Sequence, residues 1–139
     1  MIEVKDIVKS FDGNVVLDHI STILRDGEVN MIIGQSGSGK TVMLKSLIGL
    51  HAVDSGSILY DGRDIAQMSE EEIRMLHREA GVLFQGSALF DSMSVIENVL
   101  FPMEMFSHQS KEDMRSRAEF CLRRVEMPEH IWHSMPSEI

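Results

Sequence analysis

The most informative stretch of this chain is Gly34-Gln35-Ser36-Gly37-Ser38-Gly39-Lys40-Thr41. It matches the spacing GxxxxGK[ST], in which glycines let the backbone curl so that its N–H groups converge on an anion. The apolar run Val29-Asn30-Met31-Ile32-Ile33 predicts a strand directly before it. The residues after it predict a helix whose inner face carries Met43, Leu44, Leu47 and Ile48. Strand, loop and helix are the context that this motif requires.

Phosphate oxygens are the anion that this loop suits. The predicted helix begins at about Lys40, so its N-terminal dipole reinforces the converging N–H groups. Lys40 can reach the β- and γ-phosphates of a nucleoside triphosphate, and the Thr41 hydroxyl can bind Mg²⁺. The alternative is a glycine-rich turn that binds nothing. We predict ATP and Mg²⁺ binding through Gly34, Ser36, Gly37, Ser38, Gly39, Lys40, Thr41 and Val42.

Antiparallel hairpins are predicted on both sides of the loop. Ile2 and Val4 alternate with polar residues, and a second apolar stretch at 15–24 follows the turn at 12–14. A second hairpin joins 57–60 to 63–65 through Asp61-Gly62, which makes Asp61 a turn residue. The predicted class is an α/β P-loop NTPase (RecA-like) core with an N-terminal antiparallel β layer and an incomplete parallel sheet.

Serine caps mark the starts of the later helices. Ser69 with Glu72 predicts a capping box that opens a helix to about Arg78. Ser94 with Glu97 predicts another capping box. Ser110 with Asp113 predicts the cap of a longer helix, whose apolar face carries Met114, Ala118, Cys121, Leu122 and Val125.

A short strand is predicted between the first and second of these helices. Val82-Leu83-Phe84 forms a buried apolar run that ends at Gln85, and the pattern after it is helical. We therefore divide the chain into a nucleotide-binding core with its antiparallel layer, residues 1–87, and the start of a helical subdomain, residues 88–139.

Composition restricts the possible partners. The chain has 139 residues, 43% of them apolar, and no run of about 18 apolar residues that would span a membrane. Its formal net charge of −9 disfavours binding to nucleic acid, so no nucleic acid partner is expected. The start of the chain shows no signal-peptide pattern, and we expect a cytoplasmic protein.

Three separated features resemble the ATP-binding subunits of ABC transporters. They are the loop, the opening strands and Gln85. The resemblance implies that Phe11 stacks on adenine with Val16 packed beside it, although an isolated Phe is more often a core or hairpin residue. It implies that Gln85 approaches Mg²⁺ and the attacking water. Together with the loop, this gives Lys40 and Gln85 as the expected catalytic residues, and Thr41 and Gln85 as the expected metal ligands.

The same resemblance implies partners. Residues 86–98 are similar to the family's entry into its helical subdomain, which grips a membrane-spanning transporter subunit. The full-length protein is then expected to be a homodimer of ATPase subunits at the cytoplasmic face of a membrane. The sequences of residues 84–95 and 41–45 together resemble ATPases of Mce-type phospholipid-trafficking systems, which implies phospholipid as the cargo.

Residues 135–139 resemble the loop that runs into the family's signature sequence. The chain is therefore expected to be an N-terminal fragment that binds ATP with little or no hydrolysis and exposes apolar surface. Three alternatives remain: a soluble ABC-type ATPase acting on DNA or ribosomes, a noncatalytic nucleotide-binding module, and a metabolite kinase.

Overall fold

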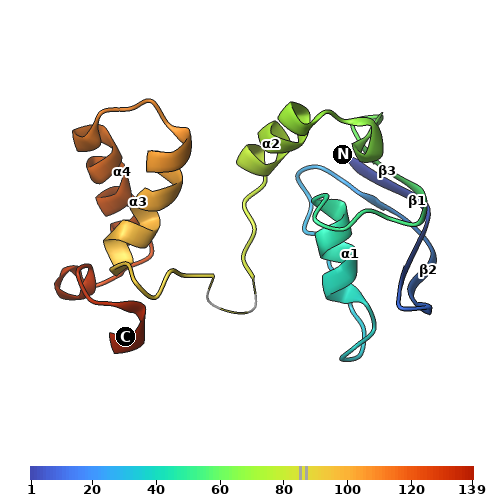
Figure 1. The fold of residues 1–139 in the computed structure, drawn as a ribbon, viewed down its shortest axis with the longest axis horizontal. Helices are drawn as coiled ribbons and strands as arrows, with labels where there is room; N and C mark the ends of the chain where they lie inside the picture. The colour runs from blue at the N-terminus through green and yellow to red at the C-terminus, as the bar shows by residue number, and fades with distance from the viewer. Residues whose placement is uncertain (85, 87) are drawn as a thin grey trace. The chain divides into compact units, whose positions relative to one another are not determined.

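The computed structural model describes residues 1–84, 86 and 88–139, so the predicted Gln85 lies outside the described residues. The chain forms two compact units, Met1–Val82 and Leu83–Ile139 (Figure 1). Each unit has its own hydrophobic core. The loop and both predicted base-site residues belong to the first unit.

The first unit contains a four-stranded sheet with the order β2-β1-β3-β4. Its strands are β1 (Ile2–Phe11), β2 (Asn14–Leu24), β3 (Ser55–Tyr60) and β4 (Arg63–Asp64). All three pairings are antiparallel, which confirms both predicted hairpins. Ile65 was predicted to extend the return strand, but it begins the 3-10 turn Ile65–Gln67 because the Asp64 carboxylate accepts the N–H of Ala66 and caps that turn.

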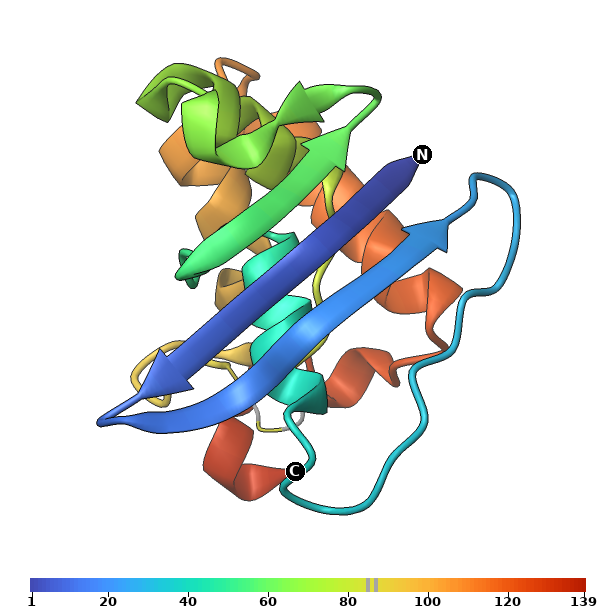
Figure 2. The same cartoon turned by 90° about the vertical axis from the view of Figure 1, so that its right-hand side faces the viewer.

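Helix α1 (Lys40–Leu47) packs on one face of this sheet (Figure 2). Met43 and Leu47 lie one turn apart on its buried side, and Tyr60 Oη donates to the Leu47 carbonyl at 2.6 Å. They join a core formed with Val4, Ile7, Leu17 and Ile58. Leu44 was predicted to face inward, but it is 54% exposed because the sheet-facing stripe runs through Met43, Ser46 and Leu47.

Two predicted strands are absent. Residues 29–33 and 82–84 have no strand conformation, and no described residue pairs with them in the sheet. A strand of a parallel sheet obtains its hydrogen bonds from neighbouring strands, and an apolar sequence alone does not supply them. The apolar side chains of these segments are consequently exposed, most strongly Val29 at 94% and Leu83 at 99%.

Helix α2 (Glu70–Glu79) begins where its cap predicts. The Ser69 N–H donates to the Glu72 carboxylate at 2.8 Å, and Ser69 Oγ accepts the Glu72 N–H at 3.3 Å. This capping box satisfies helix N–H groups that would otherwise lack partners.

The second unit consists of α3 (Val95–Phe106), α4 (Lys111–Arg124) and the 3-10 turns Glu129–Ile131 and Pro136–Glu138. The predicted serine caps at Ser94 and Ser110 are confirmed. Its core is Val95, Ile96, Ala118, Leu122 and Trp132. Val125, predicted on the apolar face of α4, is 68% exposed because the helix ends at Arg124. Within the described residues, no helix has the length and apolar character that a membrane span needs.

Candidate nucleotide-binding site

The glycine loop has the backbone conformation that its sequence predicts. Gly37 has φ of 79° and Gly39 has φ of 86°, a left-handed region that residues with a Cβ rarely adopt. The Ser38 N–H donates to the Gln35 carbonyl at 3.2 Å and closes the turn. The loop therefore depends on glycine at these two positions.

Close packing fixes the loop against its surroundings. A Cβ on Gly34 would lie 2.5 Å from Ser38 Oγ. A Cβ on Gly39 would lie 2.9 Å from the Val16 carbonyl oxygen and 3.1 Å from Val16 Cγ1. The structure thus brings Val16, a predicted base-site residue, against the last glycine of the loop.

Helix α1 differs from the other α-helices of the described chain at its first turn. Gly39 provides no side-chain cap, and no acidic residue lies in that turn. In contrast, α2, α3 and α4 each begin after a serine and carry an acidic first turn. The first N–H groups of α1 and its positive dipole end are therefore left for an external anion.

The Lys40 side chain curls back over the loop. Its Nζ donates to the carbonyl oxygens of Gly34 at 2.8 Å and Gln35 at 2.6 Å. No described carboxylate forms an ion pair with it. A positive charge bonded only to neutral carbonyls beside an uncapped helix end is well placed to meet phosphate oxygens.

The remaining predicted loop residues take two kinds of position. Ser36, Ser38 and Thr41 are exposed, so their hydroxyls are accessible to a ligand. The Val42 side chain packs against the core of the first unit, which leaves its backbone N–H as the group that a phosphate can reach. A cavity of about 370 Å³ lies beside the loop, and its lining includes Leu17, Ile20, Ser38 and Lys40.

Phe11 occupies the last position of β1, where it pairs with Asn14 at the end of the hairpin. Its side chain is 39% exposed. Sequence reasoning did not single out Lys9 and His51, yet both contact the Phe11 ring. Lys9 lies two positions before Phe11 on the same face of β1. His51 comes close because the segment after α1 returns to the hairpin, which no local pattern signals.

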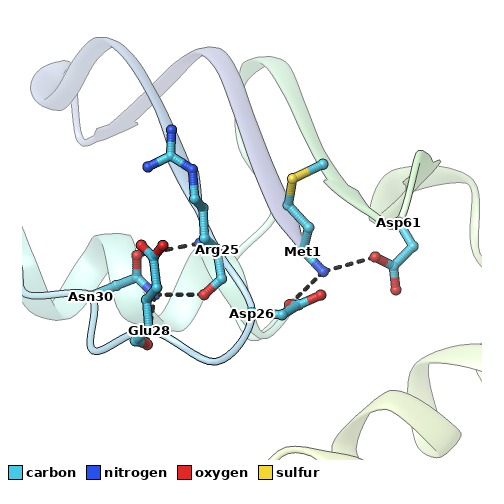
Figure 3. Close-up of polar contacts among 6 residues, drawn as sticks. All are labelled: Met1, Arg25, Asp26, Glu28, Asn30 and Asp61. Atoms are coloured by element: carbon cyan, nitrogen blue, oxygen red, sulfur yellow. Dashed lines mark hydrogen bonds and ion pairs between the residues drawn. The ribbon is translucent and has the colours of Figure 1, made fainter.

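Polar contacts stabilise the turn at residues 25–30, which leads from β2 toward the glycine loop (Figure 3). Asn30 Nδ2 donates to the carbonyls of Arg25 at 3.0 Å and Glu28 at 3.2 Å. The Met1 ammonium group forms ion pairs with Asp26 at 2.6 Å and Asp61 at 2.7 Å. These contacts join the start of β1 to the turns after β2 and β3, and Asp61 is a turn residue as predicted.

Known proteins are similar to this chain in sequence, and solved structures are similar to it in fold. The methionine import ATP-binding protein MetN of Clostridium acetobutylicum is 33% identical over 100% of this chain and 43% of its own length. The probable ribonucleotide transport ATP-binding protein mkl of Mycobacterium leprae is 41% identical over 82% of this chain and 33% of its own length. The chain thus spans less than half the length of either relative.

A solved ATP-binding cassette, dimeric in a post-hydrolysis state with ADP and Pi, has a TM-score of 0.89 with this chain. It is 26% identical and is matched over 100% of this chain and 63% of its own length. This likeness confirms the predicted α/β P-loop class of fold. The predicted parallel sheet is not seen among the described residues, because all of their strand pairings are antiparallel. The family model described as ABC transporter matches residues 17–138, so the chain belongs to the ABC transporter family.

Proposed function

We propose that this chain binds ATP with Mg²⁺ and provides the phosphate-binding part of an ATPase. The observation that carries this proposal is the start of α1, which has neither an acidic residue nor a side-chain cap and follows a glycine loop that holds the Lys40 ammonium. That arrangement gathers positive charge and free N–H groups at one point.

In this proposal, the loop binds phosphate through its backbone and Lys40, and it binds Mg²⁺ through Thr41. The N–H groups from Gly34 to Val42 surround the phosphates, and Lys40 leaves its carbonyl partners to bind the terminal phosphates. Mg²⁺ is usually held by one or two side chains together with phosphate oxygens, and the exposed Thr41 hydroxyl suits that role. When bound, Mg²⁺ would neutralise part of the negative charge of the phosphates. Gln85 is proposed as a second ligand and catalytic residue from its sequence position.

For the whole protein, we propose an ATPase subunit of an ABC transporter. The family membership and the import functions in the names of MetN and of the phosphonates import relative PhnC of Fusobacterium nucleatum support this role. The dimeric state of the matching cassette supports a homodimer. Residues 1–87 would hold nucleotide, and residues 88–139 would meet membrane-spanning subunits at the cytoplasmic face.

We also propose phospholipid as the cargo, on the basis of the sequences of residues 84–95 and 41–45. Relatives carry names that specify methionine, ribonucleotide, phosphonates and spermidine/putrescine, so the family accommodates varied cargo. Turnover by the assembled transporter in vesicles should rise with phospholipid and remain unchanged with methionine or spermidine. The opposite ranking would remove the phospholipid assignment.

The experiment that tests nucleotide binding is calorimetric titration of this chain with ATP and Mg²⁺. Lys40→Ala should weaken binding at least about tenfold because it removes a charge-assisted bond to phosphate. Lys45→Ala is the matched control, since Lys45 lies in the last turn of the same helix. Equal ATP affinity in wild type and Lys40→Ala would exclude the proposed site.

A further inference from the structure

The Phe11 ring has two charged or aromatic neighbours. Lys9 Nζ lies 5.3 Å from the ring centroid, within the range of a cation–π contact. The His51 ring lies edge-on, with centroids 5.5 Å apart and an interplanar angle of 73°. Part of the ring nevertheless remains open to solvent. Phe11 is thus an exposed aromatic surface whose orientation is restricted from within the protein.

Asp54, three residues after His51, is bonded to the end of β1. Its carboxylate accepts bonds from Lys9 Nζ at 2.8 Å and from the Ser10 N–H and hydroxyl, both at 2.6 Å. Its own N–H donates to the Val8 carbonyl at 2.8 Å. The Lys9 side chain is 16% exposed and the Asp54 side chain is 40% exposed, so water reaches this ion pair mainly from the Asp54 side. Four bonds from one residue therefore fix the end of β1 to the segment before β3.

The same segment is anchored to α1. The N–H groups of Leu50 and His51 donate to the Lys45 carbonyl at 2.8 and 3.3 Å. The glycine loop precedes the first residue of α1, and His51 follows its end. One helix therefore carries the phosphate loop at its N-terminus and a contact to the Phe11 ring beyond its C-terminus.

We propose that Lys9, His51 and Asp54, which we call the hairpin bracket, are positioning residues that hold the Phe11 ring for stacking against the base of the bound nucleotide. This inference rests on the proposed function. The partly exposed Phe11 ring, with the Lys9 ammonium beside it, is suited to stack against a flat aromatic base. The bracket acts on the base through Phe11 and makes no contribution to phosphate binding.

The test compares ATP with inorganic tripolyphosphate, which has no base. Calorimetric titration with each ligand is carried out on the wild-type chain and on Phe11→Ala, His51→Ala and Asp54→Asn. Phe11→Ala should lower ATP affinity about tenfold, since it removes the aromatic side chain on which the base stacks. The two bracket variants should lower it about three- to tenfold. Tripolyphosphate affinity should stay within about twofold in all of them.

Two further variants separate positioning from general damage to the fold. His51→Phe keeps an edge-on ring and should restore ATP affinity. Asp54→Asn tests the expected loss of affinity if His51→Ala does not fold. The double variant Phe11→Ala/His51→Ala should bind ATP no more weakly than Phe11→Ala, because the bracket acts through Phe11. Asp12→Asn, which changes a hairpin carboxylate outside the bracket, is the matched control and should behave as wild type.

The bracket proposal is overturned if His51→Ala and Asp54→Asn retain wild-type ATP affinity while Phe11→Ala loses it. It is also overturned if the bracket variants lose tripolyphosphate affinity to the same extent as ATP affinity, since that reveals a purely structural role. Failure of the proposed nucleotide site has a different signature. In that case neither ligand's affinity responds to Lys40→Ala.

Discussion

Gly39 lies so close to Val16 that a Cβ atom at Gly39 would be 2.9 Å from the Val16 carbonyl oxygen. This approach joins the last glycine of the phosphate loop to β2, and therefore to the hairpin that carries Phe11. Gly39 also has a φ of 86°. Two independent constraints, backbone conformation and space, therefore exclude a side chain at this position.

The first prediction concerns Gly39→Ala. The left-handed conformation and the contact with rigid backbone should lower the free energy of unfolding by about 2 kcal/mol or more. Displacement of the loop should also weaken binding of both ATP and tripolyphosphate by about tenfold, equivalent to about 1.4 kcal/mol. Urea denaturation and calorimetric titration measure the two effects.

Two other glycines provide controls for this prediction. Gly37 and Gly13 have φ of 79° and 81°, but a Cβ on either would meet no atom within 4 Å. Gly37→Ala and Gly13→Ala should therefore each cost about 1 to 2 kcal/mol of stability from strain alone. Gly13→Ala, at the hairpin turn, should leave tripolyphosphate affinity unchanged. If it weakens that affinity as much as Gly39→Ala does, local contact at Gly39 is not the cause.

The second prediction concerns Ser46, which is 1% exposed within α1 and whose hydroxyl has no hydrogen-bond partner among the described residues. A buried polar group without a partner costs about 1 to 3 kcal/mol. Ser46→Ala should therefore raise the free energy of unfolding by about 1 kcal/mol. Tyr60→Phe is the opposite control, because it deletes the bond to the Leu47 carbonyl and should lower stability by about 1 kcal/mol. A stability loss in Ser46→Ala would show that its hydroxyl is satisfied.

The third prediction is a pH dependence at Asp54. The bond from Lys9, followed by those from Ser10, lowers the pKa of Asp54 from 3.8 to about 2. Since the folded pKa lies below the unfolded one, this contribution to stability is present above pH 3.8 and is lost as the pH falls toward 2. The carboxyls of Asp61, Glu72 and Glu97 also have lowered pKa values. The loss of stability of the whole chain at low pH therefore cannot be assigned to Asp54 alone.

Comparison with Asp54→Asn isolates the contribution of this one carboxylate. The wild type should exceed the variant in unfolding midpoint by a constant amount above pH 4, and the difference should shrink between about pH 4 and 2. NMR titration of the Asp54 carboxyl carbon gives the folded pKa directly. A difference that persists unchanged at pH 2 would contradict the assigned ion pair.

Local signals in the sequence predicted the elements that depend on local interactions. The caps at Ser69, Ser94 and Ser110 fix helix starts because serine and the acidic residue three positions later are neighbours in the chain. The hairpins are likewise set by their turn residues. The phosphate loop belongs to this class, since its glycines and the following helix occupy one short segment.

Features that require a distant partner were not predictable in the same way. Residues 29–33 and 82–84 have strand-like sequences, but a strand is defined by its hydrogen-bonded neighbours. The contact of His51 with Phe11 depends on the return of the chain after α1, which Asp54 stabilises. Leu44 was predicted to be buried but is exposed. The periodic pattern of α1 does not specify which of its residues face the sheet, because that depends on how the helix packs.

The last prediction follows from the exposed apolar segment 29–33. Val29 and Ile33 are 94% and 85% exposed, so neither contributes much to the core. Burial of such a side chain at a contact between molecules is worth about 1.5 to 3 kcal/mol, which favours self-association. The double variant Val29→Thr/Ile33→Thr should weaken self-association at least about tenfold, measured by sedimentation velocity, with no change in the unfolding midpoint. Val4→Thr, at a buried position of β1, is the contrasting control and should lower that midpoint because Val4 belongs to the core. Unchanged association of the double variant would show that another surface drives contacts between chains.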